Sequence, residues 1–402
     1  MWEKLEEVRK QGEIKNGSSL LNRNFILIIV SSFIFFFNFH SFILFPIRIQ
    51  ELGGSVSTIG FIMGAAWIST IFTTPLVGVL VDRWGGKWFL ASGGLVMSLT
   101  TLPFAYLGSL NFLFPVLRML QGASLSLCFI SAGTLTAEVS PLSRRAQALG
   151  IFGLFAIINH ALAPYVGKLI IESSGFKIFF QFVFAIGLLS FFVSILIDEP
   201  GKSDKSNEKG SSYLNTFLRM GVPVSAFTLM LVGVGFITTI TFLPVFSKGI
   251  GVESFQDFFL AYTISALCMR LFGGWIPDRY GKKRTSVPSL LFFSISICWL
   301  GFSSNRFDLI YTGILFGLSH GLLYPSIYAL VIDLTPMLDK GKAFSICSVA
   351  FTFGGMLGTI IYGSIAELYG FKVMYQMVAL SCLLGFVVFS FYGREDVNGV
   401  RS

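Results

Sequence analysis

Charged residues are scarce in this chain of 402 residues. They make up 12% of the sequence, about half of the roughly 25% that is usual in soluble proteins. Hydrophobic residues make up 54%, and Phe alone occurs 45 times. So few charges could not cover so much apolar surface in water, which excludes a soluble enzyme, a disordered protein and a fibrous protein. What remains is a polytopic membrane protein.

Several motifs of catalysis are also missing from the sequence. It has no phosphate-binding P-loop, no metal-ligand spacing and no nucleophile elbow. We therefore expect that the protein is not an enzyme, that it binds no cofactor or metal, and that ATP does not drive it directly. The 5 cysteines are widely spaced within apolar stretches. We interpret them as small buried apolar residues and not as a disulfide framework.

Twelve apolar runs are long enough to cross a membrane, which takes about 20 residues each. Each run is continuous, whereas strands of a membrane barrel would alternate apolar and polar residues, so helices are favoured. The runs lie near 24–46, 56–79, 88–108, 111–137, 146–170, 176–197, 217–246, 255–276, 286–303, 306–332, 342–365 and 372–392. We therefore predict a tail (1–23), a six-helix bundle (24–197), a flexible linker (198–216), a second six-helix bundle (217–393) and a tail (394–402).

The net charge of +8 follows the expected topology. Most Lys and Arg residues fall in the tails, the linker and the loops that lie on the linker's side of the membrane. Cytoplasmic loops are enriched in these residues, so both termini are predicted to be cytoplasmic. Nucleic acid is not needed to explain the charge. The first apolar run continues for a full span, which indicates a signal-anchor and not a cleaved signal.

The two halves of the chain resemble each other. The segment GFKIFFQ at 175–181 returns as GFKVMYQ at 370–376, and Asp82 and Glu172 have counterparts at Asp278 and Glu367. These matches fall at the same places relative to the spans, so we infer a duplicated six-helix unit whose copies are parallel. A parallel repeat with a site between its halves is typical of secondary transporters.

Four motifs resemble those of the major facilitator superfamily. The superfamily's loop between helices 2 and 3 resembles GVLVDRWGGK at 78–87. Its equivalent loop in the second half, between helices 8 and 9, resembles GGWIPDRYGKKR at 273–284. Arg118-x-x-Gln121-Gly122 resembles its fourth-helix motif. Ala163-Pro164-x-x-Gly167 resembles the fifth-helix motif of drug:proton antiporters, with Ala where Gly is expected. The resemblance implies the superfamily's fold of twelve helices in two bundles.

The resemblance also implies that the two loops latch the bundles together. In the first loop we expect Gly78 to permit close helix approach and Gly85 to allow a sharp turn. The alternative is that these residues only fix topology and packing. The gating-loop candidates are Gly78, Asp82, Arg83, Gly85, Lys87, Gly274, Asp278, Arg279, Gly281 and Lys282.

Other charges stand near the same loops. Glu138 with Arg145 and Asp333 with Lys340 have the spacing for ion pairs at the ends of helices 4 and 10. Arg270, eight residues before Asp278, is expected to support the second loop.

All 3 histidines fall within predicted spans, where ionisable residues are costly and are candidates for function. Histidine titrates near physiological pH and could carry a proton. No Asp or Glu lies in the middle of a span, so either the histidines or the interfacial carboxylates couple transport to protons, or the protein is not proton-coupled. The alternative role for these polar residues is hydrogen bonding between helices. The cavity candidates are Asn38, His40, Arg118, Gln121, Asn159, His160, Thr238, Thr239, His320, Tyr324 and Tyr328.

These observations predict a secondary active transporter that moves a small organic solute by alternating access, first of all proton-coupled efflux. The alternative is an importer of an organic anion or metabolite, a symporter or uniporter, with Arg118 as the counter-charge. A non-transporting sensor or a lipid flippase is a third hypothesis. The expected partners are the solute, membrane lipids and protons. We expect a monomer in the plasma (inner) membrane, because twelve spans make one complete pathway.

Overall fold

The computed structural model describes residues 20–199, 212–219 and 221–395, and this part of the chain is helical without strands. The predicted tails and the central part of the predicted linker lie outside the described residues. The helices are α2 (Arg23–Ser41), α3 (Phe45–Glu51), α4 (Val56–Trp84), α5 (Lys87–Thr101), α6 (Leu113–Val139), α7 (Arg145–Ile195), α8 (Tyr213–Phe217), α9 (Val222–Gly249), α10 (Gln256–Phe272), α11 (Ile276–Tyr280), α12 (Lys282–Leu300), α13 (Arg306–Asp333) and α14 (Lys340–Tyr392).

The described helices make twelve membrane crossings. Eight stretches are long and apolar enough to span a membrane. Two of them, α7 and α14, each contain two crossings joined at Gly175 and Gly370, whose φ angles of 78° and 83° suit glycine and few other residues. The remaining two crossings are α10 and α12, which has Lys282, Lys283 and Arg284 in its first turn.

One predicted boundary is wrong. The seventh crossing was expected to start at residue 217, but Phe217 ends the separate short helix α8 and the crossing starts at Val222. The chain breaks between them at Gly221, which has a φ of 90°. Hydropathy alone does not detect this break, because the apolar residues Phe217 and Leu218 lead almost directly into the apolar helix that follows.

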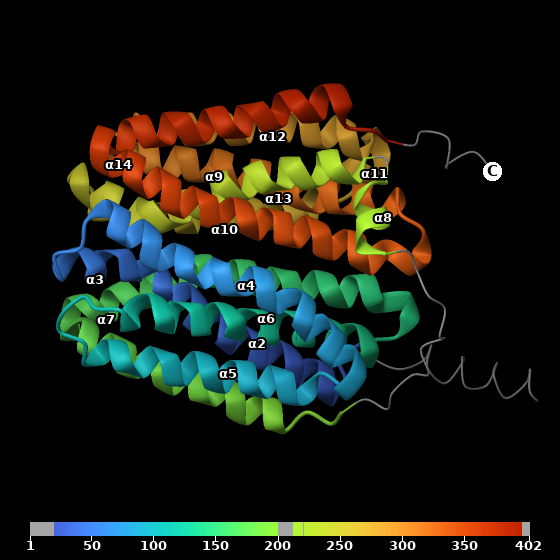
Figure 1. Cartoon of the computed structure of the whole chain (residues 1–402), viewed down its shortest axis with the longest axis horizontal. Helices are drawn as coiled ribbons and strands as arrows, with labels where there is room; N and C mark the ends of the chain where they lie inside the picture. The colour runs from blue at the N-terminus through green and yellow to red at the C-terminus, as the bar shows by residue number, and fades with distance from the viewer. Residues whose placement is uncertain (1–19, 200–211, 220, 396–402) are drawn as a thin grey trace, which may run out of the picture.

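The helices form two bundles that meet along a seam. Figure 1 shows α2 to α7, blue to green, lying beside α9 to α14, yellow to red. Across the seam α4 packs against α14, and the first half of α7 against α10. One end of the molecule carries α8, α11 and the end of α14 (Figure 1, right), and we call it the linker face; the opposite end, with α3, is the distal face. These contacts do not test the residue ranges predicted for the two bundles (24–197 and 217–393), which stay predictions.

A repeated carboxylate cap joins the ends of each bundle. Glu199, just after α7, accepts hydrogen bonds from the backbone N–H groups of Gly86 (2.8 Å) and Lys87 (3.0 Å) at the start of α5. Glu395 does the same for Lys282 and Lys283 at the start of α12. A carboxylate there satisfies orphan donors and the positive end of the helix dipole. The duplicated unit therefore keeps this contact in both copies.

Candidate functional site

A cavity of about 650 Å³ lies between the two bundles. Its inner wall is mostly apolar and carries many aromatic side chains, and its opening toward the linker face is lined by Asp82, Tyr213 and Lys342. A volume of this size accommodates a drug-sized molecule. The aromatic residues of the wall are Phe36, Phe39, Phe42, Trp67, Phe129, Phe236, Tyr324, Phe344 and Phe351.

The seam is closed at the distal face. The Glu367 carboxylate accepts hydrogen bonds from the backbone N–H of Ser57 (2.8 Å) and from its hydroxyl, linking α14 to the start of α4. The Lys168 ammonium of α7 donates to the Glu253 carbonyl (2.6 Å) ahead of α10. Between these contacts, a Cβ on Gly363 would lie 3.2 Å from the Cα of Gly60. The cavity therefore ends below a tightly packed seal.

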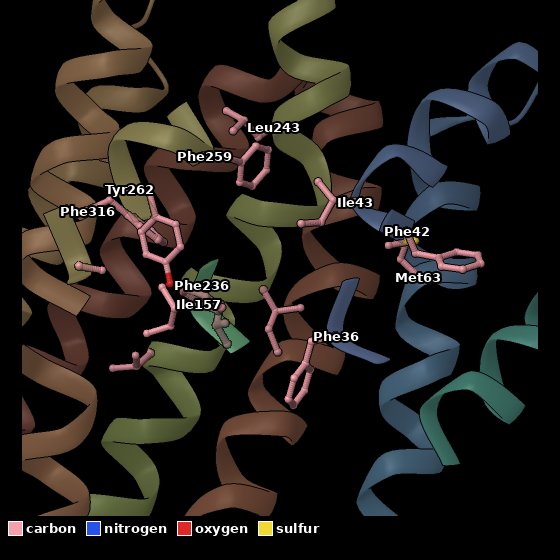
Figure 2. Packing of buried hydrophobic residues seen from close by; sticks show 14 of the residues in the cluster. Phe36, Phe42, Ile43, Met63, Ile157, Phe236, Leu243, Phe259, Tyr262 and Phe316 are labelled. Carbon is pink, nitrogen blue, oxygen red and sulfur yellow. The ribbon is translucent and has the colours of Figure 1, made fainter. Parts of the chain in front are cut away.

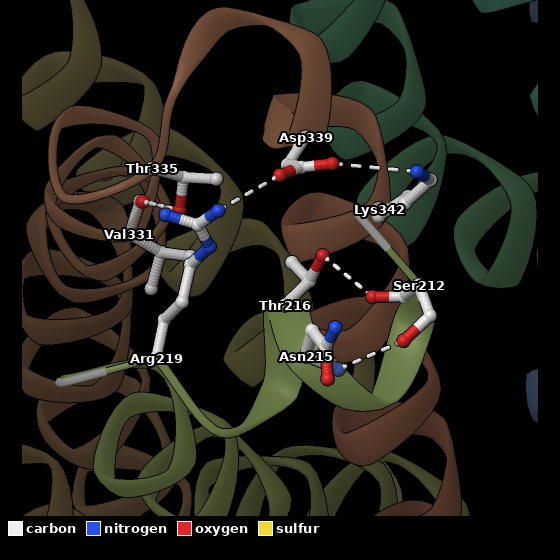
Figure 3. A network of polar contacts seen from close by, with 8 residues as sticks. All are labelled: Ser212, Asn215, Thr216, Arg219, Val331, Thr335, Asp339 and Lys342. Carbon is white, nitrogen blue, oxygen red and sulfur yellow. Dashed lines mark hydrogen bonds and ion pairs between the residues drawn. The ribbon is translucent and has the colours of Figure 1, made fainter. Parts of the chain in front are cut away.

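At the linker face, Asp339 joins the segment ahead of α9 to α14. It is buried and accepts hydrogen bonds from Arg219 (3.2 Å) and Lys342 (3.3 Å), as Figure 3 shows. Beside it, the Ser212 hydroxyl caps α8 by accepting from the Asn215 N–H (3.2 Å). These contacts hold α8 near the opening of the cavity, where Tyr213 lines it.

The three histidines gather at mid-depth around two aromatic rings of the second bundle. The rings of His40 and His160 lie 3.9 Å apart between centroids. His320 stacks on Phe236 at 4.3 Å, and its Nδ1 lies 3.4 Å from the Tyr262 hydroxyl. The His160 ring also lies 5.7 Å from that of Tyr262. Two histidines of the first bundle and one of the second therefore meet across the seam.

Tyr262 is the residue of this cluster that the sequence analysis missed. Figure 2 shows it packed beside Phe316 and close to Phe236. It lies on α10 eight residues before Arg270, a spacing that puts the two side chains on similar faces of the helix. That spacing is a signal that could have directed attention to both.

Arg118 is almost fully buried, with 2% of its surface exposed, and lines the cavity. Its Nη1 donates to Gln121 Oε1 (2.6 Å), and its guanidinium lies 5.0 Å from the Phe42 ring centroid. Its Nε is buried and has no hydrogen-bond partner among the described residues. No ion pair joins it to a carboxylate in the described part of the chain.

Arg270 does not support the loop after α10 as expected. It interacts electrostatically with His160, His320, Tyr262 and Tyr324, so it belongs with the mid-depth cluster. A Cβ on Gly153 of α7 would lie 3.6 Å from its Nη1, which places the guanidinium at the contact between α7 and α10. The expectation rested on its nearness to Asp278 in the sequence, whereas the rotation of α10 turns its side chain toward α7.

Only part of the predicted polar belt lines the cavity. His40, Arg118, His160 and Tyr324 do, and Thr241 joins them. His320 lies directly behind Phe236, and Gln121 behind Arg118. Of the other candidates, Asn38, Asn159, Thr238 and Tyr328 contact neighbouring helices.

Those contacts are specific. Asn38 donates to the Val183 carbonyl (2.9 Å) and Asn159 to the Phe33 carbonyl (3.0 Å), so both bind α2 to α7. The Tyr328 hydroxyl donates to Ser348 (3.2 Å). Thr238 faces Gly358 of α14, and Thr239 is fully buried.

The gating-loop candidates take different roles in the structure. Gly85 and Gly281 have φ angles of 92° and 99°, so both turns use the conformation expected of glycine. Gly78 has open space around its Cβ position and lines the cavity, so it does not mediate close helix approach. Asp82 lines the opening of the cavity.

Ion pairs at the helix ends differ from those expected. Asp333 pairs with Lys282 and not with Lys340. Arg145 donates to the Ala137 carbonyl (2.8 Å). Lys282 reaches Asp333 because the turn at Gly281 brings the start of α12 to the end of α13. The other cations of the two loops lie against aromatic rings: Arg83 over Trp84, Lys87 over Trp88 and Arg279 over Trp275. Gly274 precedes α11, and Asp278 lies within its first turn.

Comparisons with known proteins identify the family. A model of the Major Facilitator Superfamily matches residues 26–276 and 249–401. The chain belongs to the Major Facilitator Superfamily. It is 29% identical to the quinolone resistance protein NorA of Staphylococcus aureus over 85% of this chain and 89% of that protein. It is 24% identical to the multi-drug resistance efflux pump PmrA of Streptococcus pneumoniae, covering 86% and 90%.

Two further similarities bear on function and fold. The staphylopine export protein of Staphylococcus aureus is 21% identical over 83% of this chain and 87% of that protein. Among solved structures, the nucleoside transporter NupG superposes with a TM-score of 0.75 at 16% identity, covering 93% of this chain and all of the other. This superposition supports the fold alone. The chain is thus an integral membrane transporter of the superfamily.

Proposed function

We propose that this transporter exports a small organic solute in exchange for protons. Three relatives bear the names of exporters or resistance proteins, and the cavity lies where alternating access requires a site, between the two halves of a parallel repeat. The linker face carries most of the Lys and Arg residues, so we assign it to the cytoplasm. The cavity then opens inward and the distal seal closes the outer side, a state ready to load solute from the cell.

The observation that carries proton coupling is the histidine cluster. The described carboxylates lie near helix ends, near the kinks of α7 and α14 or in loops, so no carboxylate occupies the centre of the seam. His40 and His160 line the cavity, and His160 contacts Phe236 of the second bundle. A proton on this cluster would change its charge where the bundles meet, and so would bias one arrangement of the bundles against the other.

Proteoliposomes containing a pH-sensitive dye test this proposal. With a panel of lipophilic drugs and metabolites, a substrate should trigger proton movement in the native protein. His160→Phe and His320→Phe each replace the imidazole with an aromatic ring that cannot bind a proton, and each should abolish the proton signal. Tyr375→Phe is the matched control, because it removes a buried hydroxyl that has no hydrogen-bond partner among the described residues. Solute exchange that persists in the native protein without proton movement would overturn the coupling.

The buried cation favours a second candidate function, uptake of an organic anion. Arg118 lines the cavity without a carboxylate partner among the described residues. The two functions differ in the direction of flux relative to the proton gradient. We further propose that the protein acts as a monomer in the plasma membrane, in contact with lipids through its exposed apolar helix faces.

A further inference from the structure

The charges in the cavity bear on the chemical class of the solute. The inner wall carries one full charge, the Arg118 guanidinium, while Asp82 and Lys342 lie at the opening. Every acidic residue of the described chain lies near a helix end, a kink or a loop. An ion in a site of low dielectric is stabilised strongly by an opposite charge and poorly by anything else. Arg118 therefore has no counter-charge among the described residues, and an anionic solute would supply one.

The hydrogen-bonding groups around Arg118 point to the same class. Gln121 occupies one N–H of the guanidinium, and Nε has no partner. The indole N–H of Trp67, which also lines the cavity, is a second buried donor without a partner in the described chain. The two residues lie on neighbouring helices, since Ser69 of α4 donates to the Met119 carbonyl of α6. Unsatisfied donors are matched by a ligand that accepts hydrogen bonds, which an ammonium group cannot do.

The rest of the wall indicates the body of the solute. Phe42 lies under the guanidinium, and Phe39 lies 6.0 Å from Trp67 between ring centroids. Flat apolar side chains pack well against an aromatic ring, and a guanidinium binds a planar or tetrahedral acid group through two donors.

We propose that the transported solute is an aromatic organic anion, whose acid group binds Arg118 and whose ring fills the space between Phe39, Phe42 and Trp67. This inference rests on the proposed function, in that the cavity is the transport site, but not on the direction of transport. Carboxylates and sulfonates share the required chemistry. A cation would bring a like charge to a buried guanidinium, and a neutral solute would leave it without a counter-charge.

Binding of three probes that share one ring tests the charge preference. Calorimetric titration of the purified full chain would use naphthalene-2-sulfonate, naphthalene-2-sulfonamide and 2-naphthylmethylammonium. We expect the sulfonate to bind at least about tenfold more tightly than the amide, the usual worth of a hydrogen bond to a charged group. Equal or tighter binding of the amide or the ammonium, or no binding of the sulfonate, would overturn the inference without any variant.

Variants assign the preference to Arg118. Arg118→Gln should remove the advantage of the sulfonate, and Arg118→Lys should keep part of it. Arg306→Gln is the matched control, because Arg306 is exposed and pairs with Asp257 away from the cavity. A preference that survives Arg118→Gln would overturn the assignment. Failure of the proposed function is distinguishable: the sulfonate would then bind selectively, but no solute would be transported under either pH gradient.

Discussion

The seal at the distal face depends on glycine at position 60, and Gly60→Ala tests that dependence. A Cβ there would lie much closer to the Thr359 carbonyl oxygen than the van der Waals contact distance of the two atoms, and 3.3 Å from the Cα of Gly363. Both obstacles belong to the backbone of α14, so no side-chain rotation relieves them and the two helices must move apart. Within α4 itself the change is favourable, because alanine is the better helix former.

The expected magnitude follows from the cost of overpacking. One added methyl group in a tight contact costs about 1–3 kcal/mol, which shifts the ratio of distal-closed to distal-open molecules by about 5- to 150-fold. Hydrogen–deuterium exchange measures this shift. Peptides covering 55–64 and 357–367 should exchange faster in Gly60→Ala than in the native protein.

The control is Gly133→Ala in α6, where a Cβ would meet nothing within 4 Å. It should leave the exchange of both distal peptides unchanged. Equal exchange in the native protein and in Gly60→Ala would refute the inference that this contact holds the distal seal closed.

Three further predictions follow from other contacts. Hydrogen bonds from the Ser55 and Ser57 hydroxyls and from the Ser57 N–H hold the pKa of Glu367 below its ordinary value of 4.5. The ionised form therefore stabilises the seal above that value, and this stabilisation is lost as pH falls through the lowered pKa. Hydrogen–deuterium exchange at the distal face should thus become faster in acid, and Glu367→Gln should abolish this acid sensitivity. Equal acid sensitivity of the variant and the native protein would contradict the prediction. Glu199→Ala removes the cap of α5 and should lower the free energy of unfolding by about 1 kcal/mol, seen as a lower melting temperature; an unchanged melting temperature would argue against the cap. Gly354→Val places a side chain against the Met230 backbone, so we expect the loss of monodisperse protein in size-exclusion chromatography, and a folded, active variant would show that α9 and α14 can separate.

The amount of the fold that the sequence predicts reflects what hydropathy measures. Apolar runs located the membrane crossings, because a span must be apolar along its whole length. The same signal could not separate the end of α8 from α9, since Phe217 and Leu218 are apolar and lie only a few residues before Val222. The turns at Gly85 and Gly281 were predictable from local chemistry alone.

The candidate site was less predictable, because it depends on how each helix is rotated. Intramembrane polarity pointed to His40, Arg118 and His160, which line the cavity, but equally to Asn38 and Asn159, which bind neighbouring helices. A polar side chain in a membrane helix serves either purpose, and only the packing distinguishes them. The internal repeat points to Glu367, but its partner Ser57 is distant in the sequence, so the contact between them is not predictable.

Solute accumulation under imposed pH gradients tests the central claim most directly. Naphthalene-2-sulfonate stays ionised and does not cross the bilayer as a neutral acid, so its uptake into proteoliposomes reports the protein. Proton-coupled export requires exchange, so an acid interior should drive accumulation and Arg118→Gln should prevent it. Accumulation driven only by an acid exterior would show symport and contradict the account.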